Sequence, residues 1–231
     1  MAPGEGKAGD SDVGTKTQKL SLVYVDSAFW RAEVPRLAFF IGGVDFEDKR
    51  LTSEEFREKK SEFPFGQIPV LYVDGKSVAQ SGGICRFAGK KAGKGLYPRD
   101  DFLAAKVDEV IDFASDMTSK VAPSLREKDP EKRVEMRKVL AEETLPNCFA
   151  MLERVLKENG ANSNYFVGNS LTIADLAIWR IMWWFTNGIL DGIPKDIAAP
   201  FTGLCRVINT VDSHPKVVEW KEKYPQHYKK D

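Results

Sequence analysis

The sequence predicts two domains of different fold class: an α/β domain over residues 19–97, followed by an all-α domain over residues 98–231. In the first part, strand and helix signals alternate in the order β-α-β-α-β-β-α. After Pro98 there is no strand pattern, and apolar residues recur at helical spacing. Residues 1–18 are rich in Gly, Lys, Asp, Ser and Thr, and we expect a disordered tail there.

The first α/β unit begins with an apolar run at Leu20–Val25, which has the composition of a strand. Asp26 and Ser27 then offer N-cap oxygens to a helix from about Phe29 to Ile41. Gly42–Gly43 is expected to end this helix, because glycine is favoured just after a helix C-terminus.

Turn chemistry predicts the rest of this domain. Asp74–Gly75 is the strongest hairpin signal in the chain, so antiparallel strands are expected on both sides of it. The expected elements are a short strand at Asp45–Arg50, a charged helix from Ser53 to about Lys60, strands at Val70–Val73 and Lys76–Ala79, and a helix that begins after Ser81 and ends near Gly89.

The second domain contains a capping box at Thr172–Asp175, with Leu171 and Leu176 placed as a hydrophobic staple. We therefore interpret Thr172 and Asp175 as structural residues that begin a helix. The aromatic side chains of that helix recur at helical spacing, which favours packing between helices. They are Trp179, Trp183, Trp184 and Phe185.

Charge and cysteine content exclude several classes of protein. Lys plus Arg and Asp plus Glu each number 34, and the net charges of residues 1–97 and 98–231 are only +2 and −2. We therefore expect no nucleic-acid partner. The longest apolar stretch, Ile181–Phe185, is too short to span a membrane, and we find no secretory signal. Three widely spaced cysteines without a C-x-x-C pattern indicate reduced thiols and a cytoplasmic location.

Five short motifs carry a resemblance to a known family. They are Phe-Glu-Asp-Lys-Arg at 46–50, Phe-Pro-Phe-Gly-Gln-Ile-Pro-Val-Leu-Tyr-Val-Asp-Gly at 63–75, Ala-Gln-Ser at 79–81, Leu-Tyr-Pro at 96–98 and Leu-Thr-Ile-Ala-Asp-Leu at 171–176. In order and spacing they resemble the cytosolic glutathione transferases, especially the sigma class, which includes the haematopoietic prostaglandin D synthase. The resemblance covers about residues 19–225.

The resemblance implies a thioredoxin-like domain that binds glutathione, and a helical domain that supplies much of the pocket for a hydrophobic electrophile. Glutathione is then the co-substrate, and no further cofactor is expected. A free thiol has a pKa of about 8.5, so the protein must stabilise the reactive thiolate. Tyr24, at the end of the first strand, matches the catalytic tyrosine whose hydroxyl donates to the sulfur. By position alone, Tyr24 is equally a strand-end tyrosine with its ring in the core.

Ser27 is the alternative to Tyr24, because some transferase classes use a serine at the start of this helix. The spacer Val25–Trp30 is one residue longer than in the sigma pattern, so we expect a remodelled turn. Arg31 matches the arginine that supports the tyrosine. A positive charge there would favour ionisation of the site, whereas an ordinary surface ion pair is the alternative interpretation.

The resemblance also implies the residues that bind glutathione. Ile68, before a cis Pro69, would pair its backbone with the cysteinyl moiety, next to Gln67. Gln80 and Ser81 precede a helix whose N-terminus would hold the γ-glutamyl carboxylate, although Ser81 could also be an ordinary N-cap. The two remaining contacts lie on the charged helix: Lys60 would reach the glycine carboxylate, and Phe56 replaces a tryptophan that donates an indole N–H.

Asp116 matches an aspartate that reaches across a homodimer to the ligand. In the prostaglandin synthase, three carboxylates cluster there and bind magnesium or calcium. Here Ser115 stands between Asp112 and Asp116 in that set, so we predict no metal site. The predicted function is conjugation of glutathione to hydrophobic electrophiles in detoxification. The alternatives are a non-catalytic binding protein and a glutathione-dependent prostaglandin-type isomerase.

Overall fold

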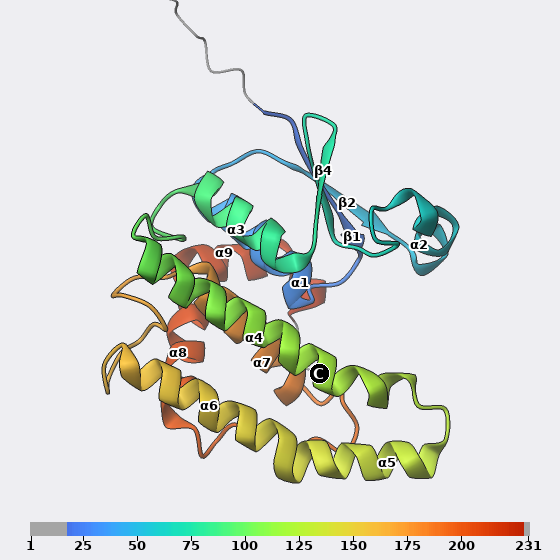
Figure 1. Cartoon of the computed structure of the whole chain (residues 1–231), viewed down its shortest axis with the longest axis vertical. Helices are drawn as coiled ribbons and strands as arrows, with labels where there is room; N and C mark the ends of the chain where they lie inside the picture. The colour runs from blue at the N-terminus through green and yellow to red at the C-terminus, as the bar shows by residue number, and fades with distance from the viewer. Residues whose placement is uncertain (1–17, 229–231) are drawn as a thin grey trace, which may run out of the picture.

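A four-stranded sheet with the strand order β2-β1-β3-β4 forms the N-terminal half of the protein. β1 (Leu20–Val25) is parallel to β2 (Glu47–Leu51) and antiparallel to β3 (Val70–Val73), and β3 is antiparallel to β4 (Lys76–Ala79). The computed structural model describes residues 18–228 (Figure 1). The tail predicted at 1–18 therefore lies outside the described residues except for Gln18, whose side chain accepts a hydrogen bond from Lys91 at 2.9 Å.

The helices of this half confirm the predicted element order and correct the predicted end of one helix. They are α1 (Trp30–Gly42), α2 (Ser53–Lys59) with a 3-10 turn η1 (Lys60–Glu62), and α3 (Ser81–Ala92). α3 continues through Gly89 instead of ending there. A Cβ at Gly89 would lie 3.0 Å from Ile173 and 3.1 Å from Tyr97, so this glycine permits close packing and does not end the helix.

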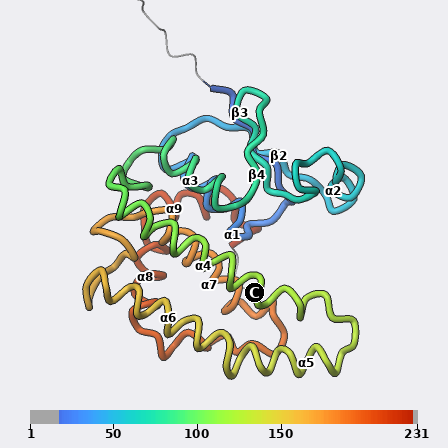
Figure 2. Tube along the Cα trace, viewed as in Figure 1, coloured from blue at the N-terminus to red at the C-terminus, as the bar shows by residue number. Residues whose placement is uncertain are grey.

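The C-terminal half is helical, as predicted. Its helices are α4 (Asp101–Arg126), α5 (Pro130–Val139), α6 (Leu145–Glu158), α7 (Ile173–Thr186), α8 (Thr202–Asp212) and α9 (Pro215–Lys223), with a π-helical segment η2 (Leu140–Thr144) and a 3-10 turn η3 (Pro225–His227). Figures 1 and 2 show α4 beneath α3, and α5, η2 and α6 as one long rod at the lower edge. None of the helices in the described part of the chain is long and apolar enough to cross a membrane.

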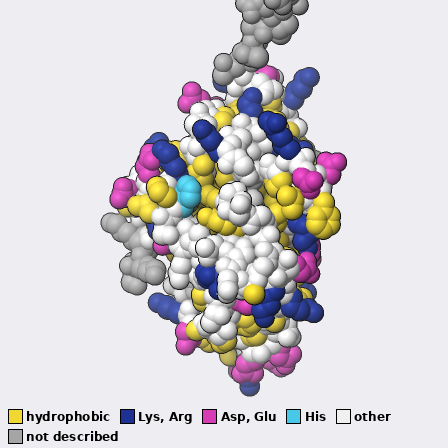
Figure 3. Space-filling model, turned by 90° about the vertical axis from the view of Figure 1, so that its left-hand side faces the viewer, with side chains coloured by type: hydrophobic (Ala, Val, Ile, Leu, Met, Phe, Trp, Pro, Cys, Tyr) yellow, Lys and Arg dark blue, Asp and Glu magenta, His cyan; other side chains and the backbone are white. Residues whose placement is uncertain are grey.

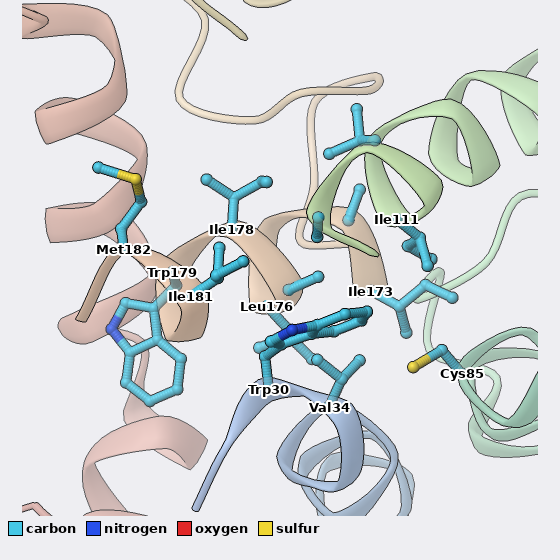
Figure 4. Packing of buried hydrophobic residues seen from close by; sticks show 14 of the residues in the cluster. Trp30, Val34, Cys85, Ile111, Ile173, Leu176, Ile178, Trp179, Ile181 and Met182 are labelled. Carbon is cyan, nitrogen blue, oxygen red and sulfur yellow. The ribbon is translucent and has the colours of Figure 1, made fainter. Parts of the chain in front are cut away.

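The main core joins the two halves. Trp30 and Val34 point from α1 toward Ile173 and Leu176 of α7, as Figure 4 shows. The Trp30 indole is fully buried, and its N–H donates to the Thr118 hydroxyl of α4 at 2.9 Å. The interface therefore consists of a continuous apolar core with a satisfied indole N–H, and it fixes the end of β1 against α4 and α7.

A buried ion pair on α1 ties this core to the C-terminus. Glu33 is 1% exposed, and its carboxylate contacts Arg36 Nη1 at 3.2 Å. The same carboxylate accepts the indole N–H of Trp220 at 2.7 Å and the hydroxyl of Tyr228. Because the Glu33 carboxylate is buried, it needs hydrogen-bond donors, and Trp220 and Tyr228 supply two of them.

The predicted capping box of α7 is present. The Asp175 carboxylate is fully buried and accepts from the N–H and hydroxyl of Thr172 and from the N–H of Phe166, each at 2.8 Å. Burial raises the pKa of Asp175 to about 6, so the carboxyl is largely ionised at neutral pH. Thr172 and Asp175 therefore hold the start of α7 against the preceding loop, and neither lines a cavity near Tyr24.

Asp175→Ala should lower the free energy of unfolding by about 2–4 kcal/mol, because two buried backbone donors lose their acceptor. Asp100→Ala is the matched control: Asp100 is an exposed N-cap that accepts one bond, from Leu103 N–H at 2.9 Å, and should cost about 1 kcal/mol. Urea denaturation of both variants measures the difference. Equal losses of unfolding free energy in the two variants would show that the buried capping box contributes no more than an exposed N-cap.

Acidic and basic side chains are interspersed on the surface. On the face in Figure 3, neither sign forms an extended patch. This distribution agrees with the neutral net charge, and that face offers no basic surface for phosphate neutralisation.

Candidate active site

Tyr24 lies near the end of β1, in the middle of the sheet. Its backbone pairs with Arg50 of β2, and its side chain is 8% exposed, with the ring in the core. Its hydroxyl has no hydrogen-bond partner among the described residues. Burial raises the pKa of Tyr24 despite the opposing charges of Arg31 and Arg36. The phenol is therefore protonated at neutral pH and can donate a hydrogen bond.

Two arginines of α1 act on Tyr24 electrostatically. Arg31 forms no ion pair with any described residue, so the surface-pair interpretation is wrong. Arg36 is fully buried, and its guanidinium carbon lies 5.9 Å from the centroid of the Tyr24 ring. The pKa of Tyr24 is nevertheless raised, because the effect of burial outweighs that of the two positive charges.

The turn between β1 and α1 differs from the sequence prediction. Phe29 is the N-cap residue and makes no side-chain cap, whereas the sequence predicted caps from Asp26 and Ser27. Asp26 instead accepts from Arg50 Nη1 at 2.7 Å, and this hydrogen bond lowers the pKa of its carboxyl. The Ser27 carbonyl accepts from Arg36 Nη1 at 2.6 Å. Both residues are thus held by arginines, from β2 and from α1.

A cavity of about 500 Å³, here called the aromatic cavity, opens beside Tyr24 between the two halves of the protein. Trp183 and Trp184 of α7 form part of its wall, which the sequence did not predict. Trp184 also packs against the main core, and Trp179 and Phe185 are buried in that core, as predicted. The residues that line the aromatic cavity are Tyr24, Asp26, Ser27, Ala28, Phe29, Thr118, Leu125, Arg180, Trp183, Trp184, Ile189, Gln226 and His227. Such a cavity suits an apolar molecule next to a hydroxyl donor.

A second cavity, here called the polar groove, runs along the other side of α4 and has a volume of about 510 Å³. Arg31, Gln67, Gln80 and Ser81 all line it, so the fold brings together four of the predicted binding residues. Beside them, Ile68 precedes Pro69 in a cis peptide bond. The backbone N–H and C=O of Ile68 make no hydrogen bond to any described residue, and both remain able to pair with a ligand.

The N-terminus of α3 points donors into this groove. Gln80, with a φ of 72°, is the N-cap residue, so Ser81 is the first helical residue and not the cap predicted from sequence. Gly82 and Gly83 follow and also line the groove. The first backbone N–H groups of a helix lack intrahelical partners, so this end of the groove suits a carboxylate.

Two predicted ligand contacts lie outside both cavities. The Phe56 ring stacks on Phe63, with centroids 6.0 Å apart, in a small apolar cluster with Val23 and Val70. Lys60 is exposed in η1 beside Gly66. The structure therefore gives Phe56 a packing role and leaves Lys60 near the groove but not in its wall.

Asp116 lies on a different face of α4 and lines a cavity of about 290 Å³ against α6. It does not line the polar groove of its own chain. Asp112 borders both cavities and accepts from Arg86 Nη2 at 2.9 Å. No cluster of three His, Cys, Asp or Glu residues that could hold a metal ion occurs within residues 18–228.

Sequence reasoning missed three residues near the site. Glu33 and Arg36 escaped notice, although charges three positions apart on an otherwise apolar helix are a signal for a buried pair. Arg180, which lines the aromatic cavity, is 2% exposed. Its signal was a single arginine within the apolar sequence of α7.

Comparisons with known proteins match both halves. Residues 20–90 match the family model of the glutathione S-transferase N-terminal domain, and residues 115–224 match that of the glutathione S-transferase C-terminal domain. Glutathione S-transferase 3 of Caenorhabditis elegans is 32% identical over 198 residues, which are 84% of this chain and 92% of that protein.

Two solved structures extend the match to the whole fold. Prostaglandin synthase D of Nilaparvata lugens is 31% identical, with a TM-score of 0.78 over 90% of this chain and 98% of that one. A monomeric glutathione S-transferase of the hookworm Necator americanus is 32% identical, with a TM-score of 0.73 over 90% and 98% of the two chains. Both agree with an α/β domain followed by an all-α domain.

Proposed function

This chain belongs to the glutathione S-transferase family and is a glutathione transferase, and we propose that the Tyr24 hydroxyl stabilises the glutathione thiolate in its site. The observation that carries the proposal is a protonated phenol whose hydroxyl has no partner among the described residues and which lines the aromatic cavity. The named transferase relatives do not favour the non-catalytic binder or the prostaglandin-type isomerase.

In this proposal, glutathione lies in the polar groove. The backbone of Ile68 pairs with the cysteinyl moiety, and Gln67 lies beside it. Gln80, Ser81 and the N-terminus of α3 hold the γ-glutamyl carboxylate. Arg31, a cation without an ion pair among the described residues, adds positive charge to a groove that receives an anionic peptide. Lys60 reaches the glycine carboxylate from η1, and Phe56 makes no polar contact.

The chemistry follows from ionisation and proximity. The Tyr24 hydroxyl donates to the thiolate, which lowers the pKa of the thiol, and the aromatic cavity holds the electrophile beside it. With an activated aryl chloride, a C–S bond forms and chloride leaves with the bonding electron pair. We propose that the reaction needs no cofactor other than glutathione. We also propose a cytoplasmic location, which three free thiols, Cys85, Cys148 and Cys205, support.

Turnover of glutathione with an activated aryl chloride tests the function. We expect saturable formation of the thioether, together with ultraviolet absorbance of bound thiolate at a pH well below the pKa of the free thiol. Glutathione that binds without ionising and without turnover would instead describe a carrier.

We propose that the active form is a homodimer in which the partner's Asp116 completes the site. The support for a dimer is the exposed side chain of Phe65 and the cavity between α4 and α6, which has room for such a side chain. Phe65 is 63% exposed just before β3, and the 290 Å³ cavity between α4 and α6 has an apolar wall that includes Phe113 and Met151. An aromatic side chain of one copy would fill that cavity in the other.

Phe65→Ser should shift the protein toward monomers and raise the KM for glutathione, because the partner's Asp116 would be lost from the site. Sedimentation velocity and initial rates measure the two effects. Phe102→Ser is the matched control, because Phe102 is 72% exposed in the first turn of α4 and lines none of these three cavities. A wild type that sediments as a monomer would overturn the dimer.

A further inference from the structure

Arg180 is a buried cation without a carboxylate partner among the described residues. It is 2% exposed, its Nε donates to the Ala28 carbonyl, and its Nη2 donates to the His227 carbonyl at 3.2 Å. Nη1 is buried and has no partner in the described chain. Burial lowers the pKa of this guanidinium, although Tyr228, Glu33 and Asp212 act in the opposite direction. An unpaired buried charge is costly, so its location suggests a role beyond packing.

The guanidinium lies in the wall of the aromatic cavity. Its carbon is 3.9 Å from the centroid of the Trp183 ring and 4.5 Å from that of Tyr228. Stacking of the flat face on aromatic rings lets the N–H groups donate in the guanidinium plane, where Nε and Nη2 already have backbone acceptors. Several other arginines also have a buried nitrogen without a described partner, but Arg180 is the one among them that lines this cavity.

The other charged groups around the cavity are already compensated. Asp26 is 62% exposed and bound to Arg50 at 2.7 Å. Burial, followed by the charge of Arg50, lowers the pKa of His227, so its imidazole is neutral at neutral pH. Glu33, a buried carboxylate that acts on Arg180 electrostatically, is occupied by Arg36, Trp220 and Tyr228. The uncompensated charge is therefore positive and lies at Arg180.

We propose that the Arg180 guanidinium binds a carboxylate on the electrophile, so that this transferase prefers apolar electrophiles that carry an acid group. This inference rests on the proposed function, because the same cavity receives the electrophile beside Tyr24. The aromatic wall packs against the apolar body of the molecule, and the charge-assisted hydrogen bond fixes its orientation. For an enone, the thiolate sulfur then bonds to the β-carbon. The alkene electron pair moves toward the carbonyl, and the α-carbon takes up a proton from solvent in place of the one lost by the thiol.

Binding can be measured without any reaction by using a saturated analogue. Isothermal titration calorimetry with dihydrochalcone-4-carboxylate and its methyl ester, both in the presence of glutathione, gives the preference of the intact protein for the acid. A charge-assisted hydrogen bond predicts an acid that binds about 10- to 100-fold more tightly than the ester. An ester that binds as tightly as the acid overturns the proposal without any variant.

Arg180→Met should bring the acid-to-ester ratio of dissociation constants close to one, and Arg180→Lys should retain part of the preference. Arg180 also donates to the carbonyls of Ala28 and His227, so its replacement can reduce the amount of folded protein. The acid-to-ester ratio of dissociation constants within one variant does not depend on that amount. Arg206→Met is the matched control: Arg206 also donates to two backbone carbonyls, of Ser163 at 3.0 Å and Ala161 at 3.3 Å, but lines a different cavity. A preference that survives Arg180→Met overturns the assignment.

Turnover of chalcone-4-carboxylate separates this inference from the function itself. If the acid binds preferentially but no thioether forms, the carboxylate site stands and the transferase reaction with this enone does not. If both the acid and its ester react at equal kcat/KM and bind equally, the transferase stands and the carboxylate site is overturned.

Discussion

Tyr24→Phe should lower kcat/KM for conjugation by about 10- to 100-fold, because one charge-assisted hydrogen bond to the thiolate is lost. Stability should change little, since the ring remains in the core and the hydroxyl has no partner among the described residues. The pKa of the bound glutathione thiol should rise by about one to two units, which ultraviolet thiolate absorbance measures as a function of pH.

Two further variants make this result specific. Tyr72→Phe removes a hydroxyl from β3 in the same domain, at a residue that lines neither cavity, and should leave the thiolate titration unchanged. Ser27→Ala tests the rival donor, which also lines the aromatic cavity. A thiolate signal that persists in Tyr24→Phe and disappears in Ser27→Ala would transfer the role to Ser27.

Arg36→Met should reduce the free energy of unfolding by about 3–5 kcal/mol, which is the usual cost of breaking a buried ion pair on one side. Arg36 is fully buried and contacts Glu33 at 3.2 Å, Asp48 at 3.0 Å and the Ser27 carbonyl at 2.6 Å. The substitution leaves the Glu33 carboxylate buried without a cation. Urea denaturation with a comparison of m-values measures the loss.

The double variant Glu33→Leu/Arg36→Met is the control for this effect. It removes both charges, so it should recover part of the stability lost in Arg36→Met, and the double-mutant cycle gives the coupling energy. The losses from Glu33→Leu alone and from Arg36→Met alone could instead add up to the loss in the double variant. In that case the two side chains do not act as a pair.

Local signals predicted the fold well where turn chemistry determines the structure. The strands Val70–Val73 and Lys76–Ala79 appear at the expected residues because Asp74 and Gly75 both have positive φ, 50° and 83°, as a tight hairpin requires. The capping box at Thr172 succeeded for the same reason, since its partners lie within three residues.

Predictions failed where a distant residue competes for a side chain. Asp26 does not cap α1 because Arg50, on the neighbouring strand, binds its carboxylate. Helical spacing placed Trp183 and Trp184 on one helix but could not reveal that the β1–α1 turn leaves a cavity in front of them. The motifs placed Gln67, Gln80 and Ser81 together, and all three line the polar groove, whereas Arg180 depends on contacts with Ala28 and His227 that no local pattern encodes.

The hydrogen bonds that Trp220 and Tyr228 donate to Glu33 impose an order on the folding of the protein during its synthesis. Glu33 leaves the ribosome long before Trp220 and Tyr228, which donate to its carboxylate. Domains generally fold during translation from the N-terminus onward. Here the nascent first domain would have to bury a carboxylate before its final donors exist. Completion of its core therefore waits until Trp220 and Tyr228 have been made, and a nascent chain stalled before Trp220 would leave the Glu33 carboxylate without these two donors.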